Sequence, residues 1–169
     1  DLERAIRLLV VAAARDPDER RYDIAVQELL TAKERWDALV GHHRTVAVRT
    51  SDASRAVQAR TRAAELLEAK LERPDEAAVE LAAGYVQAPD NDFIAGELAR
   101  LLEVTGDRPA LIAHLRRWTE QSGPEAQANV LLWLAKTLMQ HADDAHEGVG
   151  LIEHAVTIEG REEALEVLS

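Results

Sequence analysis

Apolar residues recur every three or four positions along almost the whole chain, a spacing that predicts amphipathic α-helices. Runs in which apolar and polar residues strictly alternate are missing, so no sheet is expected. The chain is therefore predicted to be all-α, with about ten helices. They are expected over residues 2–15, 19–33, 36–50, 53–72, 75–87, 91–105, 109–121, 125–142, 145–158 and 161–168.

Residues that stop a helix mark the expected boundaries. Pro17 and Pro89 each precede an aspartate, and proline cannot continue a helix because it lacks an amide hydrogen. Gly106 is a typical C-terminal stop. The connections are only a few residues long, so neighbouring helices are predicted to form antiparallel hairpins.

The apolar pattern repeats at an offset of 72 residues (77 − 5 = 72). The first set is Ala5, Ile6, Leu9, Ala12, Pro17 and Asp18, and the second is Ala77, Ala78, Leu81, Gly84, Pro89 and Asp90. Near Gly123 the offset falls to 71 (138 − 67 = 71), and a third start follows at Gly148. We therefore expect one helical-repeat domain over 1–169, with copies at 1–72 and 73–143 and a partial copy at 144–169. We also expect it to be a segment of a longer array.

The repeat predicts a set of buried leucines on the inner sides of the helices. They are Leu9, Leu30, Leu39, Leu67, Leu81, Leu102, Leu111 and Leu138.

These spacings resemble the tetratricopeptide repeat, whose second helix carries small, apolar and small residues before a proline. The matching sets are Ala5, Leu9, Ala12 and Pro17, then Ala77, Leu81, Gly84 and Pro89. Gly106–Asp107 resembles the loop of the motif, and Trp36 takes the aromatic place in the first copy. The resemblance implies hairpins stacked as a right-handed superhelix, as in large bacterial repeat proteins. It also implies protein or peptide binding on a concave surface lined by first helices.

Composition narrows the range of functions. The formal net charge is −11, which disfavours nucleic acids and anionic membrane surfaces as partners. No apolar run is long enough to insert into a membrane. There are no cysteines, which excludes disulfides and thiol chemistry. A cytoplasmic location is expected unless the native N-terminus is missing.

No motif for catalysis, a metal or a cofactor stands out. His42 and His114 occupy the same repeat position (114 − 42 = 72), which favours a helix-packing or surface role. His141, His146 and His154 lack the i, i+3 or i, i+4 spacing of a helical metal pair. We therefore predict no enzyme activity and no cofactor.

The resemblance assigns partner-binding positions to the outward side of each first helix. They are Arg21, Ile24, Glu28, Phe93, Glu97 and Arg100. Phe93 could instead be a hydrophobic staple at its helix start. Trp133, which lies among polar residues, either contacts a partner or packs against the next hairpin, whereas Trp36 and Trp118 are expected in the core.

The sequence thus predicts a scaffold that binds a partner protein or peptide of unknown identity. The alternative is a regulatory or spacer segment of a larger multidomain protein whose activity lies elsewhere.

Overall fold

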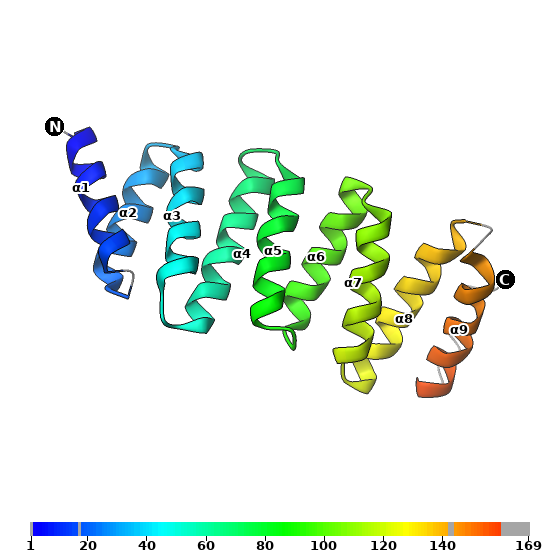
Figure 1. Cartoon of the computed structure of the whole chain (residues 1–169). Coiled ribbons are helices and arrows are strands. Elements are labelled where there is room, and N and C mark those ends of the chain that lie inside the picture. Colours follow the sequence, from blue (N-terminus) through cyan, green and yellow to red (C-terminus); the bar gives the residue numbers. More distant parts are fainter. Residues whose placement is uncertain (1, 17, 142–143, 160–169) are drawn as a thin grey trace. The chain divides into compact units, whose positions relative to one another are not determined.

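In a computed structural model, which describes residues 2–16, 18–141 and 144–159, every regular element is an α-helix (Figure 1). The nine helices in these ranges are α1 (Leu2–Arg15), α2 (Arg20–Ala32), α3 (Trp36–Arg49), α4 (Ala53–Ala69), α5 (Pro74–Gln87), α6 (Asp92–Thr105), α7 (Arg108–Gln121), α8 (Pro124–Met139) and α9 (Ala145–Glu159). The expected helix at 161–168 and the predicted break at Pro17 lie outside the described residues.

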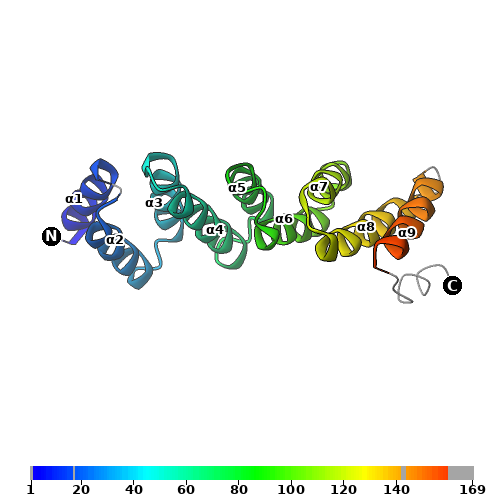
Figure 2. The same ribbon diagram turned by 90° about the horizontal axis from the view of Figure 1, so that it is seen from below.

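The helices form two compact units, Asp1–Ala88 and Pro89–Ser169. Unit 1 holds α1 to α5 and unit 2 holds α6 to α9. Within each unit, consecutive helices lie side by side as antiparallel neighbours (Figure 1), and the view from below shows the same adjacency (Figure 2). The predicted all-α hairpin architecture is confirmed for the described part of the chain.

Helix boundaries follow the sequence repeat closely. Both ends of α1 and α5 differ by 72 residues (74 − 2 and 87 − 15), and so do both ends of α3 and α7 (108 − 36 and 121 − 49). The starts of α4 and α8 differ by 71 (124 − 53), after the one-residue shift near Gly123. The repeat in the sequence therefore fixes where the helices begin.

Helices α2 and α6, each the first helix of its hairpin, end in turns at equivalent positions of the repeat, Glu34 and Gly106 (106 − 34 = 72). Gly106 has φ 74°, and the Asp107 N–H donates to the Leu102 carbonyl at 3.0 Å. Glu34 adopts the same left-handed conformation with φ 51°, and the N–H of residue 35 donates to the Leu30 carbonyl at 2.9 Å. The predicted stop at Gly106 is confirmed, and the first copy makes this turn without a glycine.

The end of α4 differs from the prediction of a helix through residue 72. The helix ends at Ala69 because Glu72 takes a left-handed φ of 54° and the Arg73 N–H donates to the Leu67 carbonyl at 2.8 Å. The last three residues of the predicted helix therefore form the turn into α5.

Six of the eight predicted core leucines are buried, namely Leu30, Leu39, Leu67, Leu81, Leu111 and Leu138. The prediction is wrong for Leu9 and Leu102, which are only half-buried. Leu9 packs at the edge of the cluster that joins α1, α2 and α3. On α6 the buried stripe runs Ile94, Leu98 and Leu101, at i, i+4 and i+7, so Leu102 falls at its border.

None of the helices in the described ranges combines the length and apolarity that crossing a membrane requires.

Candidate functional site

The equivalent histidines His42 and His114 join neighbouring helices at the same place in each unit. His42 Nε2 lies 2.7 Å from Asp23 Oδ1, and His114 Nε2 donates to the Ala95 carbonyl oxygen at 2.8 Å. Each partner lies nineteen residues earlier, on α2 or α6, and both histidines are buried. The predicted equivalence is confirmed, and the role is helix packing.

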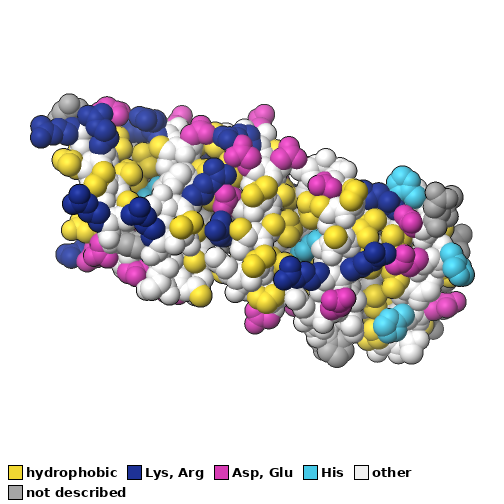
Figure 3. Space-filling view, viewed as in Figure 1, with side chains coloured by type: hydrophobic (Ala, Val, Ile, Leu, Met, Phe, Trp, Pro, Cys, Tyr) yellow, Lys and Arg dark blue, Asp and Glu magenta, His cyan; other side chains and the backbone are white. Residues whose placement is uncertain are grey.

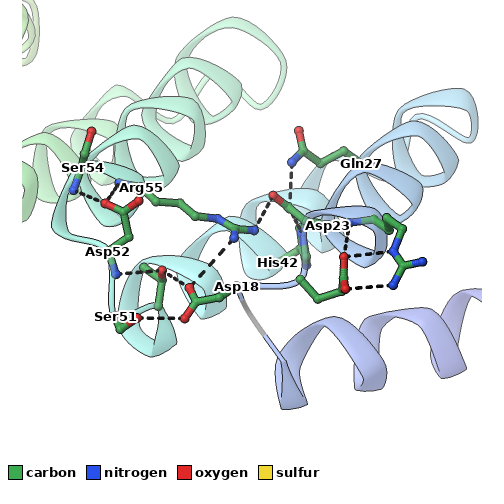
Figure 4. A network of polar contacts seen from close by, with 11 residues as sticks. Asp18, Asp23, Gln27, His42, Ser51, Asp52, Ser54 and Arg55 are labelled. Carbon is green, nitrogen blue, oxygen red and sulfur yellow. Dashed lines mark hydrogen bonds and ion pairs between the residues drawn. The ribbon is translucent and has the colours of Figure 1, made fainter.

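In unit 1 this place is the centre of a polar network that joins α2, α3 and α4 (Figure 4). Besides His42, the Asp23 carboxylate accepts from Gln27 Nε2 at 2.8 Å and from Arg55 Nη2 at 2.9 Å. The side chains of His42 and Arg55 are 2% and 10% exposed. Burial would raise the pKa of Asp23, but the hydrogen bonds from these three residues outweigh it and hold the pKa well below its usual 3.8. Asp23 therefore stays ionised and fixes the packing of three helices.

His43, the neighbour of His42, is a second buried histidine on α3. Burial lowers its pKa from 6.5 to about 4, with further lowering by His42 and Arg62 and an opposing effect of Asp23. In unit 2 the same position holds Leu115 (115 − 43 = 72), which is fully buried. A titratable group thus occupies a place that the repeat otherwise fills with a leucine.

The predicted partner-binding residues of α2 lie on its solvent side. Arg21 is largely exposed and pairs with Glu19 on its own helix start, at 3.0 Å. Ile24 is 53% exposed, and Glu28 is also exposed. The three side chains follow one another at i, i+3 and i+7, so they form one stripe.

In unit 2 aromatic rings take the place of the ion network. Trp118 Nε1 donates to Asp92 Oδ1 at 2.8 Å, and its ring centroid lies 6.1 Å from that of His114. The rings of Trp118 and Trp133 meet in a T-shaped arrangement, with centroids 6.4 Å apart. A Cβ at Gly96 would lie 3.5 Å from Trp118, so this part of α6 passes close over the ring. Trp118 therefore links α6 to Trp133 on α8.

The exposed side of α6 carries the remaining predicted positions. Phe93, Glu97, Arg100 and Val104 follow at i, i+4, i+7 and i+11, so they form one stripe. Phe93 is 64% and Val104 is 63% exposed. Between them, Arg100 Nη2 donates to Glu97 Oε2 at 2.9 Å. The Phe93 stripe, as we call these four residues, thus has apolar ends and a charged centre.

The geometry bears on the alternative roles that the sequence left open for Phe93 and for Trp133. Phe93 is the second helical residue after the N-cap Asn91 and stays mostly exposed, so it does not form a hydrophobic staple. Trp133 is half-buried, and its described ring contact is with Trp118 on α7. Trp118 is buried, as expected for a core residue, and Trp36 packs half-buried against the core of unit 1.

Sequence reasoning missed a second buried ion cluster in unit 1. Glu80 on α5 is 5% exposed and accepts from Arg44 Nε at 2.6 Å and from Arg60 Nη1 at 3.0 Å. The signal was present, because Glu80 lies three residues after Ala77 and four before Gly84, within the apolar stripe of its helix. A charged residue in such a stripe needs a partner from another helix.

Within the described residues, no three histidine, aspartate or glutamate side chains converge as metal ligands would. The carboxylates at the centres of the two ion clusters, Asp23 and Glu80, are occupied by partners from neighbouring helices.

Comparisons with known proteins agree with this architecture. No protein-family model matches the chain, and no curated protein matches it either. The crystal structure of YrrB, a TPR protein with an unusual peptide-binding site, superposes with a TM-score of 0.55 at 15% identity, covering 98% of this chain and 82% of that chain. The crystal structure of BtubC (BKLC) from P. vanneervenii gives a TM-score of 0.51 at 16% identity, covering 94% and 71%. The chain therefore has a tetratricopeptide-like helical-repeat fold.

Proposed function

We propose that this chain is a protein-interaction scaffold and that it binds a partner protein or peptide on the exposed side of its first helices. In unit 2 the binding surface is the Phe93 stripe of α6, together with Trp133 on α8. In unit 1 it is the stripe Arg21, Ile24 and Glu28 of α2. YrrB offers a precedent in the same fold, as a TPR protein with a peptide-binding site.

The observation that carries the proposal is the exposure of Phe93. The only phenylalanine of the chain leaves 64% of its surface in water, although burying such a side chain is worth about 1.5–3 kcal/mol. It caps no helix and belongs to none of the buried clusters of the described residues. An exposed aromatic side chain of this kind is a typical anchor of a binding interface.

The ion pair between the two apolar ends supports a peptide ligand. Glu97 and Arg100 are 37% and 39% exposed, so each keeps polar surface for a partner. Charges of both signs at the centre of the stripe suit a peptide that carries its own polar groups between apolar side chains. The start of α6 is fixed to α7, because Trp118 and His114 donate hydrogen bonds to the Asp92 side chain and to the Ala95 carbonyl.

The proposal is tested by selecting peptides against the immobilised chain from a displayed library and measuring their affinity by titration calorimetry. Phe93→Ala should weaken a selected peptide about tenfold or more, because a central aromatic anchor is lost. Arg100→Glu should also weaken binding. Phe93→Ala should hardly alter thermal unfolding, because its side chain is mostly exposed, and Arg100→Glu should lower the melting temperature only slightly, because it loses a partly exposed pair with Glu97.

Val86→Ala is the matched control, since Val86 is 63% exposed on α5 and lies outside both stripes. Its affinity for the peptide should equal that of the parent chain. Unchanged binding by a folded Phe93→Ala, Arg100→Glu variant would move the site away from α6. A library that yields no specific peptide would favour the alternative of a regulatory or spacer segment.

A further inference from the structure

A third exposed stripe lies on the outer side of α1. Arg4, Leu8, Val11 and Arg15 follow at i, i+4, i+7 and i+11, with Arg7 beside them. Leu8 is 62% and Val11 is 49% exposed, and the three arginines are exposed as well. We call these five residues the outer face of α1.

The opposite side of α1 is already used for folding. Ile6 and Ala13 are buried in the cluster that joins α1 to α2 and α3. Both views place α1 at the end of unit 1 with these two helices on one side (Figure 1 and Figure 2). The outer face therefore has no part in the core of the unit.

The arginines of this face differ from most others in unit 1. Arg35, Arg44, Arg55, Arg60 and Arg73 all pair with carboxylates. The side chains of Arg4, Arg7 and Arg15 make no hydrogen bond or ion pair with any residue in the part of the chain that the structure describes. Three unpaired guanidinium groups around two exposed apolar side chains are unusual in a chain with a net charge of −11.

Basic side chains from outside α1 reach both ends of this helix. Within α1 three arginines stand against one glutamate, Glu3, and Arg35 pairs with that glutamate at 3.2 Å. Near the other end, Arg49 Nη1 donates to the Ala14 carbonyl at 2.7 Å and keeps its charge. Lys and Arg side chains gather among hydrophobic ones at this end of unit 1 (Figure 3).

We propose that the outer face of α1 docks an acidic amphipathic helix of a partner protein. Charge complementarity selects the sign of the partner, because these arginines have no carboxylate partners among the described residues. Guanidinium groups also bind carboxylates in a bidentate manner, which favours Asp and Glu over other acceptors. Leu8 and Val11 require apolar side chains at the centre of the partner.

The spacing selects a helix as the partner. The stripe is straight and spans about 16 Å along the axis of α1, at 1.5 Å per residue. A second helix that carries acid, apolar, apolar and acid at i, i+4, i+7 and i+11 meets every group of the face. This spacing of four, three and four residues reads the same in both directions, so either orientation fits.

Other ligands with negative charge fit less well. A membrane-surface helix needs a wide apolar face to enter the lipid, whereas this face offers only two apolar side chains. The net charge of −11 also repels anionic lipids and nucleic acids at longer range.

The test uses the full chain and a stapled, alanine-based helical peptide with glutamate, leucine, leucine and glutamate at the stated spacing. Fluorescence anisotropy at low salt should show binding of this peptide, and the same peptide with lysine in place of both glutamates should not bind. Arg4→Glu, Arg15→Glu should weaken binding about tenfold or more, since two attractive pairs become repulsive. Leu8→Ser, Val11→Ser should weaken it by a similar factor.

The matched control is Arg20→Glu, Arg62→Glu, which reverses two other exposed arginines without described partners in unit 1. Its affinity should change less than about threefold. Equal loss in this control, or equal binding of the lysine peptide, would overturn the proposal. The surface lies on unit 1, so these results do not depend on whether Phe93 of unit 2 binds a peptide.

Two further measurements distinguish other occupants. Co-sedimentation with phosphatidylserine vesicles that is lost in Arg4→Glu, Arg15→Glu would assign the face to lipid and overturn the proposal. Concentration-dependent dimers in sedimentation velocity, lost in the same variant, would assign it to a second copy of the chain and overturn it as well. Absence of both, together with binding of the acidic peptide, supports it.

Discussion

The junction of α2, α3 and α4 in unit 1 and that of α6, α7 and α8 in unit 2 occupy the same repeat positions but use different chemistry. In unit 1 the ionised Asp23 bridges His42 and Arg55. In unit 2 the residue at the place of Asp23 is Ala95, which offers only its carbonyl to His114. The helices are instead joined by Trp118 and its ring contacts.

This difference shows that the repeat preserves where helices meet and leaves open what holds them together. An ion network is directional, depends on pH and costs desolvation, whereas aromatic packing depends on shape. The exposed Phe93, which we propose as an anchor for a peptide, lies on the unit with the aromatic junction.

The largest expected effect comes from removing the centre of the ion junction. Asp23→Ala should lower the free energy of unfolding by about 3 kcal/mol, because Arg55 would remain buried with only Asp18, at 4.0 Å, as an anionic contact. Urea unfolding followed by circular dichroism measures the loss. Amide hydrogen exchange should place it in unit 1.

Unit 2 supplies the compensating change, because the place of Arg55 is taken there by Ala126 (126 − 55 = 71). The Asp23→Ala, Arg55→Ala variant should therefore recover part of the stability. Asp37→Ala is the control, since the Asp37 side chain is 75% exposed and pairs with Arg73, outside the network. If Asp23→Ala costs no more than this control, the network is not what holds the three helices.

A smaller effect is a difference between the two units in how their stability depends on pH. The folded-state pKa of His43, about 4, lies below the unfolded value of 6.5, so the folded chain resists protonation. The contribution of His43 to the free energy of unfolding is therefore fully present above pH 6.5 and is lost as the pH falls toward 4. The loss is about 2 kcal/mol at pH 5. Urea unfolding at a series of pH values measures this slope.

His43→Leu introduces the residue of unit 2 and should remove that part of the slope between pH 6.5 and 4. His114, whose pKa is also lowered by burial, contributes its own loss in both proteins. An unchanged slope in His43→Leu would mean that His43 is accessible to protons in the folded state.

The smallest expected effect is a gain in stability at the repeat-equivalent turns. Glu34 holds a left-handed φ of 51° where unit 2 has Gly106. A non-glycine residue in this conformation costs about 1–2 kcal/mol, partly offset by the greater freedom of glycine in the unfolded chain. Glu34→Gly should therefore raise stability by about 0.5–1 kcal/mol in thermal unfolding.

Gly106→Ala should have the opposite sign, because alanine would have to adopt φ 74° there. A loss of stability in Glu34→Gly would show that the glutamate side chain contributes more than its backbone strain costs.

Helix positions could be read from the sequence because they depend on local signals. The sequence shows these signals directly, as prolines, the stop at Gly106 and the 72-residue offset. The described helices follow them. Leu102 could not be placed, because its burial depends on how α6 is oriented against its neighbours. The predicted stripes on α2 and α6 are present as exposed surfaces, and their role in binding stays a prediction.

The sequence by itself determined the helical hairpins, their repeat and the solvent-facing sides of α2 and α6, because each depends on residues a few positions apart. Only the tertiary structure decided that Asp23 meets Arg55, that Glu80 meets Arg44 and Arg60, and that the arginines of α1 meet no carboxylate in the described part of the chain. These pairings join residues 20 to 36 positions apart across different helices. The charge pattern along one helix does not show which residues of other helices will lie close to it. The packing of the helices in three dimensions decides which of the many possible charged pairs form.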